Sequence, residues 1–391
     1  MGPTPQSLHQ KFSHIFKEAP RKLAMVRSPG RVNLIGEHTD YNEGYVFPAA
    51  VDRATYVAAQ RRSDNEVSIY SANFEEKISF DLRSMKFDQN HGWANYPKAV
   101  LHTLQNRGWK LEGLNILIES DVPLGGGMSS SAALECAVAR ACLALFPYQM
   151  DRLSMAKLCQ RAENQFIGVA CGIMDQFASA FGKKGNAIFL DCRTLAYEHV
   201  PLNLAQHRLV VINSGVKRKL ASAEYNKRRE QCAEAVKAIK VKYPKVTALR
   251  DVEPSQLGEV LPLLGDVIRK RAEHVVREIQ RTKEAVTALK AADLAGFGKL
   301  MNESHGSLKS LYEVSCPELD AIVEICRGVE GVLGARMMGG GFGGCVISLV
   351  RVEQVDAVKR ELLRNYQRRF GMNPEAYEVQ TADGTAELLP G

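Results

Sequence analysis

The chain has 391 residues, of which 45% are hydrophobic and 24% are charged, and its formal net charge is +7. This composition is typical of a soluble globular protein, and the length allows two domains. No run of about 18 apolar residues predicts a membrane span, and residues 1–22 lack the hydrophobic segment of a signal peptide. We therefore expect a cytoplasmic protein that has no membrane partner. We also expect a monomer, although no sequence feature indicates the oligomeric state.

The nine cysteines are scattered along the chain, and none forms a Cys-x-x-Cys pair. An odd number of dispersed thiols favours reduced, mostly buried cysteines over a disulfide framework or a zinc site. The basic clusters at 217–219 and 227–229 are short and carry little aromatic interleaving, so we expect no nucleic-acid partner. A mild positive charge would still favour an anionic small substrate.

Polar side chains crowd the segment from Ser28 to Tyr41. Glu37, His38 and Asp40 place carboxylate oxygens and a ring nitrogen close together, a set that suits recognition of sugar hydroxyls. A polar loop that caps a helix is the structural alternative. Metal ligation by His38 with the two acids also stays open, although no second histidine lies at ligand spacing.

The following segments predict strands, then a helix, then another strand. Strands are expected over 54–60, 67–70 and 78–81, and a helix around 93–101. Trp93 and Tyr96 would share one face of this helix, where core packing is the default and lining of an adenine pocket is the alternative. A strand expected over 114–120 leads directly into a glycine-rich segment.

That segment, Pro123–Ala132, joins glycines and serines to the start of a helix. The glycines at 125–127 permit positive φ and close approach to a ligand. The serines at 129–131 precede a helix expected over 132–145 and closed by Pro147. Free amides at a helix N-terminus attract phosphate. No Gly-Lys-Ser/Thr follows the glycines, which excludes a Walker A loop; a flexible turn before a core helix is the alternative.

Two acids stand out after this helix. Asp151 can cap the N-terminus of a helix that runs to about Phe166 and carries Glu163 near its end. Asp175 is a lone acid among apolar neighbours, and a buried carboxylate must be paired or protonated. Such a carboxylate is often functional, with a helix N-cap as the structural alternative.

The second half of the chain changes from strands to long helices. Strands are expected over 187–191 and 209–213, and helices over 222–240, 267–290, 293–311 and 317–326. The apolar residues of the 267–290 helix recur at helical spacing, so this region is expected to be core-facing scaffold. We place the domain boundary near 190–205, which gives domains 1–195 and 196–391.

Near the C-terminus, Gly339, Gly341 and Gly344 formally match G-x-G-x-x-G. A dinucleotide-binding fingerprint must open a helix after a strand. Here the glycines lead into residues 345–350, which alternate and are β-branched like a strand. We therefore reject the dinucleotide interpretation.

Four segments together resemble one family. Residues 29–41 resemble the galactokinase signature, and residues 123–132 resemble the phosphate loop shared by galacto-, homoserine, mevalonate and phosphomevalonate kinases, the GHMP kinases. Residues 171–176 and 339–344 match the two other motifs of that family, in order. The joint match covers nearly the whole chain and is specific, whereas any single piece would not be.

The resemblance implies an α/β (α+β) fold of two GHMP kinase domains, with the active site in the cleft between them. The N-terminal domain, 1–195, would carry the galactokinase signature and the phosphate loop, and 196–391 would be the C-terminal domain. The implied reaction transfers the γ-phosphoryl group of ATP to the C1 hydroxyl of α-D-galactose and gives galactose 1-phosphate and ADP. Mg²⁺, which prefers oxygen ligands, would be the cofactor.

The resemblance also implies roles for single residues. Asp175 would be the general base, and Arg31 would keep it ionised and stabilise charge on the transferring phosphoryl group. The sugar would contact Glu37, His38, Thr39, Asp40, Gly172, Asp175 and Tyr225. The phosphates would be cradled by Gly125, Gly126, Gly127, Met128, Ser129, Ser130 and Ser131. Ser131 and Glu163 would hold Mg²⁺ directly or through water.

One position departs from the galactokinase pattern, because Met338 stands where these kinases usually carry Thr before the last glycines. The substitution removes a hydroxyl that could hydrogen-bond near the cleft. Two alternative functions stay open: a kinase of N-acetylgalactosamine or another hexose, and a non-catalytic sensor of sugar and nucleotide. Thr39 favours galactose, and Ser131-Ala132 together with Asp175 favour an enzyme over a sensor.

Overall fold

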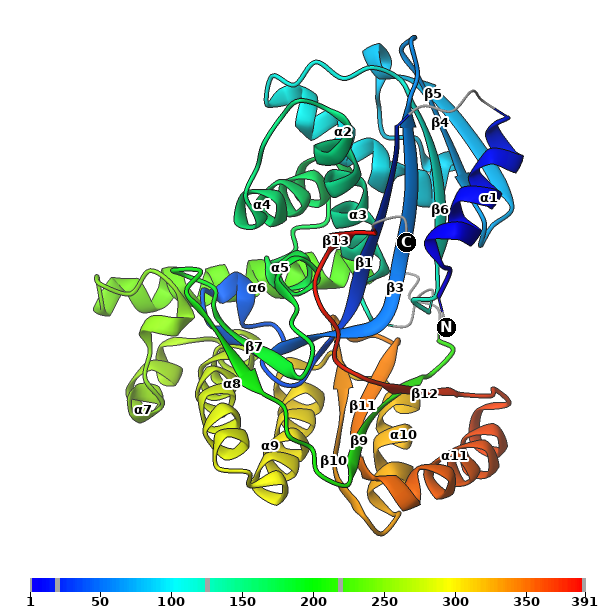
Figure 1. Cartoon of the computed structure of the whole chain (residues 1–391). Coiled ribbons are helices and arrows are strands. Elements are labelled where there is room, and N and C mark those ends of the chain that lie inside the picture. The colour runs from blue at the N-terminus through cyan, green and yellow to red at the C-terminus, as the bar shows by residue number, and fades with distance from the viewer. Residues whose placement is uncertain (1, 18–21, 124–126, 217–220, 389–391) are drawn as a thin grey trace.

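The computed structural model describes residues 2–17, 22–123, 127–216 and 221–388. Two lobes, each with a main sheet covered by helices, make up most of the molecule (Figure 1), and the described residues also form a third, three-stranded sheet. The strands are β1 Leu23–Asn33, β2 Tyr45–Val46, β3 Pro48–Arg61, β4 Glu66–Ser71, β5 Glu76–Asp81, β6 Leu114–Ser120, β7 Asn186–Asp191, β8 Tyr197–Pro201, β9 His207–Asn213, β10 Val332–Met338, β11 Cys345–Arg351, β12 Glu375–Val379 and β13 Ala386–Glu387. The helices are α1 Pro5–Phe16, α2 Asn95–Asn106, α3 Ser130–Leu145, α4 Arg152–Ala162, α5 Met174–Phe181, α6 Ala221–Lys242, α7 Leu257–Val260, α8 Asp266–Lys290, α9 Leu294–Ser307, α10 Pro317–Arg327 and α11 Val355–Phe370.

The N-terminal lobe is built on a sheet with the strand order β13-β1-β3-β6-β4-β5. The strands pair antiparallel except β4 and β6, whose parallel pairing requires a crossover, and the intervening chain includes α2. The alanine-rich helix α3 packs on β1 and β3, and α2 and α4 pack against it. On the opposite face, Leu8 and Phe12 of α1 pack against Met25 and Tyr56 (Figure 1). Both faces of this sheet are therefore covered.

The C-terminal lobe is built on an antiparallel sheet with the order β10-β11-β9-β12. Helices α6, α8, α10 and α11 contribute buried side chains to the core of this lobe. The prediction that the 267–290 helix faces the core is confirmed, because its periodic residues are buried. These are Val275, Val276, Ile279, Thr282, Val286 and Leu289.

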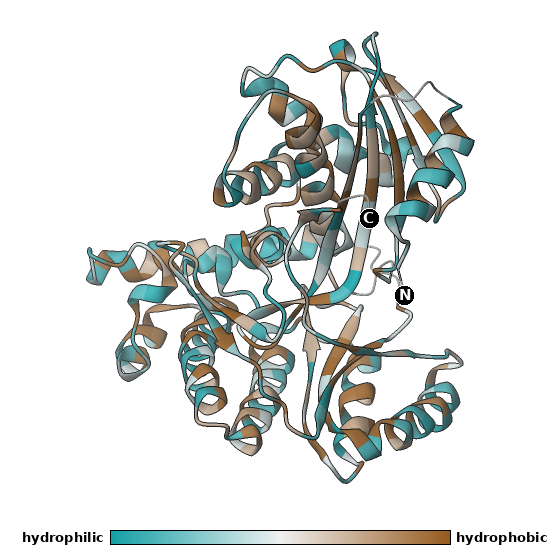
Figure 2. Ribbon diagram, viewed as in Figure 1, coloured by the Kyte–Doolittle hydropathy of each residue, from teal (hydrophilic) through white to brown (hydrophobic). Residues whose placement is uncertain are grey.

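A further cluster of buried apolar residues joins the two lobes. It brings Val32 and Phe47 from the N-terminal half together with Phe297, Met338 and Ile347 from the C-terminal half. Figure 2 shows apolar residues concentrated on the strands of both lobes and polar residues on the outer faces of the helices. The division at residue 195 stays a prediction. β13, from the C-terminal half, pairs with β1 and so belongs to the first sheet.

Most of the expected elements are confirmed, with shifted ends. Asp151 caps α4 as expected, since its carboxylate accepts a hydrogen bond from the Ser154 amide at 2.9 Å. The helix expected to reach Phe166 instead changes to a π-helical turn, Glu163–Ile167. The strand after the C-terminal glycines is β11, and the rejection of a dinucleotide fingerprint is confirmed. The sequence analysis did not predict α1, β1, α5, β10 or α11.

The cysteine prediction is also confirmed. All nine cysteines are free thiols, and most of them are buried. Among the described residues, no helix combines the length and the apolar character needed to cross a membrane.

Candidate active site

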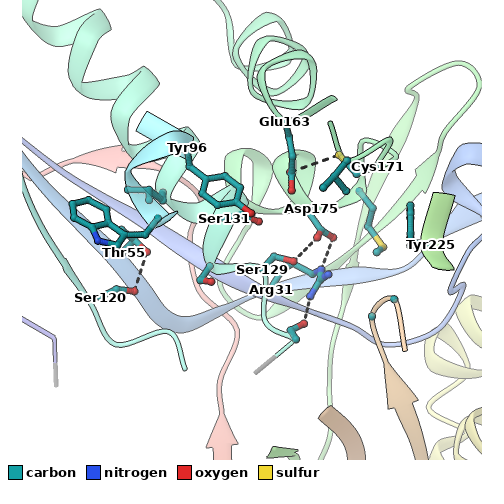
Figure 3. Close-up of a pocket in the computed structure, with 18 of the residues that line it drawn as sticks. Arg31, Thr55, Tyr96, Ser120, Ser129, Ser131, Glu163, Cys171, Asp175 and Tyr225 are labelled. Atoms are coloured by element: carbon teal, nitrogen blue, oxygen red, sulfur yellow. Dashed lines mark hydrogen bonds and ion pairs between the residues drawn. The ribbon is translucent and has the colours of Figure 1, made fainter. Parts of the chain in front are cut away.

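A cavity of about 700 Å³ is lined by residues of both lobes. The structure brings most of the sequence-predicted site residues into its wall, although they are far apart along the chain. These are Arg31, Glu37, His38, Asp40, Gly127, Ser129, Ser130, Ser131, Glu163, Gly172, Asp175 and Tyr225. Figure 3 shows Asp175, Arg31 and Ser129 turned toward one another in this cavity.

Asp175 lies in the first turn of α5, and its carboxylate accepts hydrogen bonds from side chains of two other segments. Arg31 Nε of β1 donates to Asp175 Oδ1 at 2.7 Å, and Ser129 Oγ donates to Asp175 Oδ2. Arg31 also donates to the Gly127 carbonyl at 2.5 Å, and its side chain is only 5% exposed. The helix-cap alternative for Asp175 is therefore wrong, because the carboxylate faces a buried cation and a hydroxyl.

The serine end of the 123–132 segment is held against β1 by backbone contacts. The Arg31 amide donates to the Met128 carbonyl at 3.0 Å. A Cβ at position 30 would lie 2.7 Å from the same carbonyl oxygen, so this close approach requires Gly30. Ser129 takes positive φ and α3 begins at the next residue, which directs the serine hydroxyls and the helix N-terminus to the cavity.

Asp40 and Gly172 lie next to each other in the cavity wall. A Cβ at position 172 would lie 1.9 Å from Asp40 Oδ2, so only glycine fits beside this carboxylate. Burial, followed by the negative charge of Asp175, raises the pKa of Asp40 to about 6. His38 has a positive φ, and its Nδ1 lies 2.8 Å from the Tyr41 hydroxyl. This end of the cavity thus offers carboxylate and imidazole groups on a fixed loop.

Glu37 is fixed by the C-terminal lobe. Its carboxylate pairs with Arg336, which is fully buried, and accepts a hydrogen bond from the Gly339 amide at 2.7 Å. Burial raises the pKa of Glu37 to about 7, although the Arg336 guanidinium opposes this shift. The sequence analysis missed Arg336, because no local signal indicates that a strand arginine is buried.

Two buried glutamates beside the cavity accept hydrogen bonds from the same side-chain amide, that of Gln176. Gln176 Nε2 donates to Glu163 Oε2 at 2.7 Å and to Glu135 Oε2 at 3.1 Å. Burial, followed by the charge of Asp175, raises the pKa of Glu163 to about 7. Burial and the charge of Glu163 raise the pKa of Glu135 well above its usual value. The sequence analysis assigned no role to Gln176 or Glu135; the adjacency of Gln176 to Asp175 was the available signal.

Comparisons with known proteins support one family. Residues 10–61 match the galactokinase galactose-binding signature, residues 95–183 the GHMP kinases N terminal domain, and residues 285–368 the GHMP kinases C terminal domain. The galactokinase of Fusobacterium nucleatum subsp. nucleatum is 43% identical over 98% of this chain and 99% of its own length. The galactokinase of Clostridium tetani is 43% identical over 97% of each chain. The chain belongs to the galactokinase family.

Solved structures agree with this assignment. The crystal structure of Lactococcus lactis galactokinase complexed with galactose matches with a TM-score of 0.93 at 39% identity, over 97% of this chain and 99% of that one. A mevalonate kinase matches with a TM-score of 0.61 at 20% identity, which shows the shared fold alone. The fold is thus that of the GHMP kinases, and membership of the galactokinase family makes the chain a sugar kinase.

Two residues expected at the galactokinase site lie outside the cavity wall. The Thr39 hydroxyl lies 2.8 Å from the Gly36 carbonyl and 2.6 Å from the Tyr45 carbonyl, so it stabilises its own loop. The Met128 side chain is fully buried in the core that joins the lobes. The predicted roles of Thr39 at the sugar site and of Met128 in the phosphate loop stay predictions. Gly125 and Gly126 lie outside the described residues.

Met338, which departs from the galactokinase pattern, has a hydrogen-bond partner in the structure. Met338 is fully buried, and its sulfur accepts a hydrogen bond from the Asn33 amide at 3.3 Å. Met338 therefore retains a weak acceptor near the cleft where galactokinases usually have a hydroxyl.

The end of the cavity opposite Tyr225 is aromatic. Trp93 and Tyr96 both line it, and the Trp93 ring lies parallel to Phe74, with an interplanar angle of 9°. Figure 3 shows Tyr96, Thr55 and Ser120 on this side, with Ser129 and Ser131 toward the middle. The expected helix is divided, because Trp93 lies in a 3₁₀ turn before α2. Both residues pack against the core of this lobe and also line the cavity.

Proposed function

We propose that this chain transfers the γ-phosphoryl group of ATP to the C1 hydroxyl of α-D-galactose, giving galactose 1-phosphate and ADP. The observation that carries the proposal is the contact of Asp175 with both Arg31 and Ser129 inside a cavity shared by the two lobes. A carboxylate fixed by an arginine beside a helix N-terminus combines a proton acceptor with sites for phosphate oxygens. The galactose in the related Lactococcus lactis structure supports the choice of sugar.

The order of groups along the cavity supports a placement of the two substrates. The flat face of Trp93, beside Phe74, suits a nucleotide base, because aromatic rings stack with small offset. The serines at 129–131 and the N-terminus of α3 suit the phosphates. Glu37, Asp40 and Tyr225 lie at the other end, where we assign the sugar hydroxyls. The reacting atoms would then meet beside Asp175.

Asp175 would accept the proton of the C1 hydroxyl or orient that hydroxyl for attack. A loose phosphoryl-transfer transition state needs positioning and charge stabilisation more than covalent chemistry. The bond of Arg31 to Asp175 holds the carboxylate in position, and the guanidinium charge can stabilise the transferring group. Ser129 would fix the second carboxylate oxygen.

The residues assigned to Mg²⁺ fit a hard cation. Ser131 and Glu163 both line the cavity and present oxygen atoms. Within the described ranges no lysine or arginine forms an ion pair with Glu163, and burial, followed by the charge of Asp175, raises its pKa to about 7. When bound, Mg²⁺ would neutralise charge on the β- and γ-phosphates. Gln176 would keep the Glu163 carboxylate oriented.

The remaining expectations concern the setting of the enzyme. We infer a monomer in a reducing, cytoplasmic environment, without nucleic-acid partners. The nine free thiols support a reducing compartment, because cysteines in oxidising compartments form disulfides.

A coupled assay of ADP release tests the proposal. Galactose, glucose and N-acetylgalactosamine are each offered with Mg-ATP, and calorimetry measures the binding of the same sugars. We expect turnover with galactose to exceed turnover with the other sugars by at least a hundredfold in kcat/KM. Preference for N-acetylgalactosamine or glucose would overturn the substrate. Tight galactose binding without ADP release would overturn the enzyme in favour of a sensor.

A further inference from the structure

A second cavity, of about 450 Å³, adjoins the first one. The two share a wall, since Asp40, Cys171 and Gly172 line both. The rest of the second cavity is formed by α4, the π-helical turn after it, the segment after β7, and α6, together with Tyr41 and Ile173. We call this second cavity the basic pocket.

Four cations line the basic pocket, and Asp40 is the acid in its wall. They are Lys157 and Arg161 of α4, Arg193 after β7, and Arg229 of α6. Lys157, Arg161 and Gln165 follow one another at intervals of four residues, which places them on one side of the helix. Basic side chains from three separate segments of the chain therefore line the basic pocket.

The partners of these cations divide them into two pairs. Arg193 pairs with Glu43 at 2.5 Å and with Asp251 at 2.7 Å, and Arg229 donates to the Ala170 carbonyl at 2.9 Å. These contacts fix the two arginines in place. In the described part of the chain, neither Lys157 nor Arg161 forms an ion pair. Like charges one turn apart repel each other, and an anion bound between them would relieve this repulsion.

We propose that the basic pocket binds the dianion of a small phosphate monoester, at a site separate from the phosphates of ATP. A guanidinium fork matches two phosphate oxygens, and a lysine adds a point charge. The pocket holds these cations beside amide side chains of Gln160, Asn164 and Gln165, which suit the hydroxyls of an attached organic group. Its volume suits a small metabolite rather than a nucleic acid.

The shared wall links this site to the sugar end of the active site, a step that rests on the proposed function. A dianion in the basic pocket would add negative charge near Asp40, which lines both cavities. Added negative charge favours the protonated carboxyl, which accepts weaker hydrogen bonds from the sugar than the carboxylate does. We therefore expect occupancy to raise the KM for galactose without changing kcat.

Calorimetry on the full chain tests the site without requiring turnover. The probes are inorganic phosphate and glucose 6-phosphate, at an ionic strength kept constant with chloride, because salt screens exposed charges. The variant Lys157→Ala/Arg161→Ala removes the two cations without ion-pair partners. The matched control is Arg152→Ala, since Arg152 is exposed on the same helix and lies outside the pocket wall.

We expect the dissociation constant for glucose 6-phosphate to weaken at least tenfold in the double variant and to be unchanged in the control. Tighter binding of glucose 6-phosphate than of inorganic phosphate would indicate that the organic group is recognised; the reverse would limit the site to phosphate. Equal affinity in all three proteins, or no binding by the wild type at millimolar concentration, would overturn the site. Binding without a change in the galactose KM would overturn the coupling alone.

Discussion

Replacing Arg336 by methionine tests how the C-terminal lobe holds the sugar-facing loop. The side chain is fully buried in β10 and donates to the carbonyls of Leu34, Asn33 and Met337 at 2.9, 3.0 and 2.7 Å, besides its ion pair with Glu37. Methionine fills much of the volume but donates no hydrogen bond. The variant thus leaves one carboxylate and three carbonyls without this donor.

The expected loss of stability follows from the burial of both partners. Breaking a buried ion pair by removing one partner costs about 3–5 kcal/mol, because the other charge stays buried without compensation. Against a total stability of roughly 5–15 kcal/mol, this is a large fraction. The raised pKa of Glu37, about 7, limits the loss, since the carboxyl can take up a proton once the guanidinium is gone. We therefore expect a loss near the lower bound, about 3 kcal/mol.

Urea unfolding followed by circular dichroism at pH 7.5 measures the loss, with two comparison variants. Arg351→Met removes an arginine whose pair with Glu353 is half exposed, and it should cost less than about 1 kcal/mol. Glu37→Gln/Arg336→Met removes both charges and should be more stable than Arg336→Met alone. If Arg336→Met loses no more stability than Arg351→Met, the buried ion pair does not hold the lobes as argued.

Three further predictions address the reaction, the departure from the family pattern, and pH. Asp175→Ala should lower kcat at least a thousandfold while galactose binding, measured by calorimetry, weakens less than tenfold; near-normal turnover would remove Asp175 from the mechanism. Met338→Thr should change kcat/KM less than threefold, because a hydroxyl replaces the sulfur that accepts from Asn33; a large gain would assign catalytic importance to that hydroxyl. Burial lowers the pKa of His274 from its usual 6.5 to about 4. Between these two pH values the unfolded chain binds a proton at His274 and the folded chain does not, so the free energy of unfolding decreases as the pH falls from 6.5 toward 4. Between pH 7 and pH 5 the wild type should therefore lose about 2 kcal/mol more than His274→Gln; equal losses in urea unfolding would contradict this assignment.

The sequence predicted local features well. A cap such as Asp151, a strand after glycines such as β11, and the periodic face of α8 depend on neighbouring residues, and each is confirmed. The family resemblance correctly selected residues that the fold brings into one cavity, including Arg31 and Asp175. Their individual roles stay predictions.

Features that depend on distant contacts could not be predicted. Arg336 lies 299 positions from its partner Glu37, and nothing near it in sequence distinguishes it from an exposed strand arginine. Hydrophobicity likewise does not separate a cavity wall from a core, so the sequence left both surroundings open for Trp93 and Tyr96, which pack against the core and also line the cavity. The hydrogen bond of the Thr39 hydroxyl to the Gly36 carbonyl shows that a motif residue can also stabilise its own loop, a contact that the motif does not indicate.

The pairing of β13 with β1 has a consequence for biosynthesis. The Thr385 and Ser28 hydroxyls lie 2.8 Å apart although 357 positions separate them in sequence. At about 5–20 residues per second, a ribosome needs roughly 20–70 s to make the intervening polypeptide. Once β3 and β6 have been made, the nascent sheet lacks the pairing of β1 with β13 until the end of synthesis, and this edge is open to aggregation.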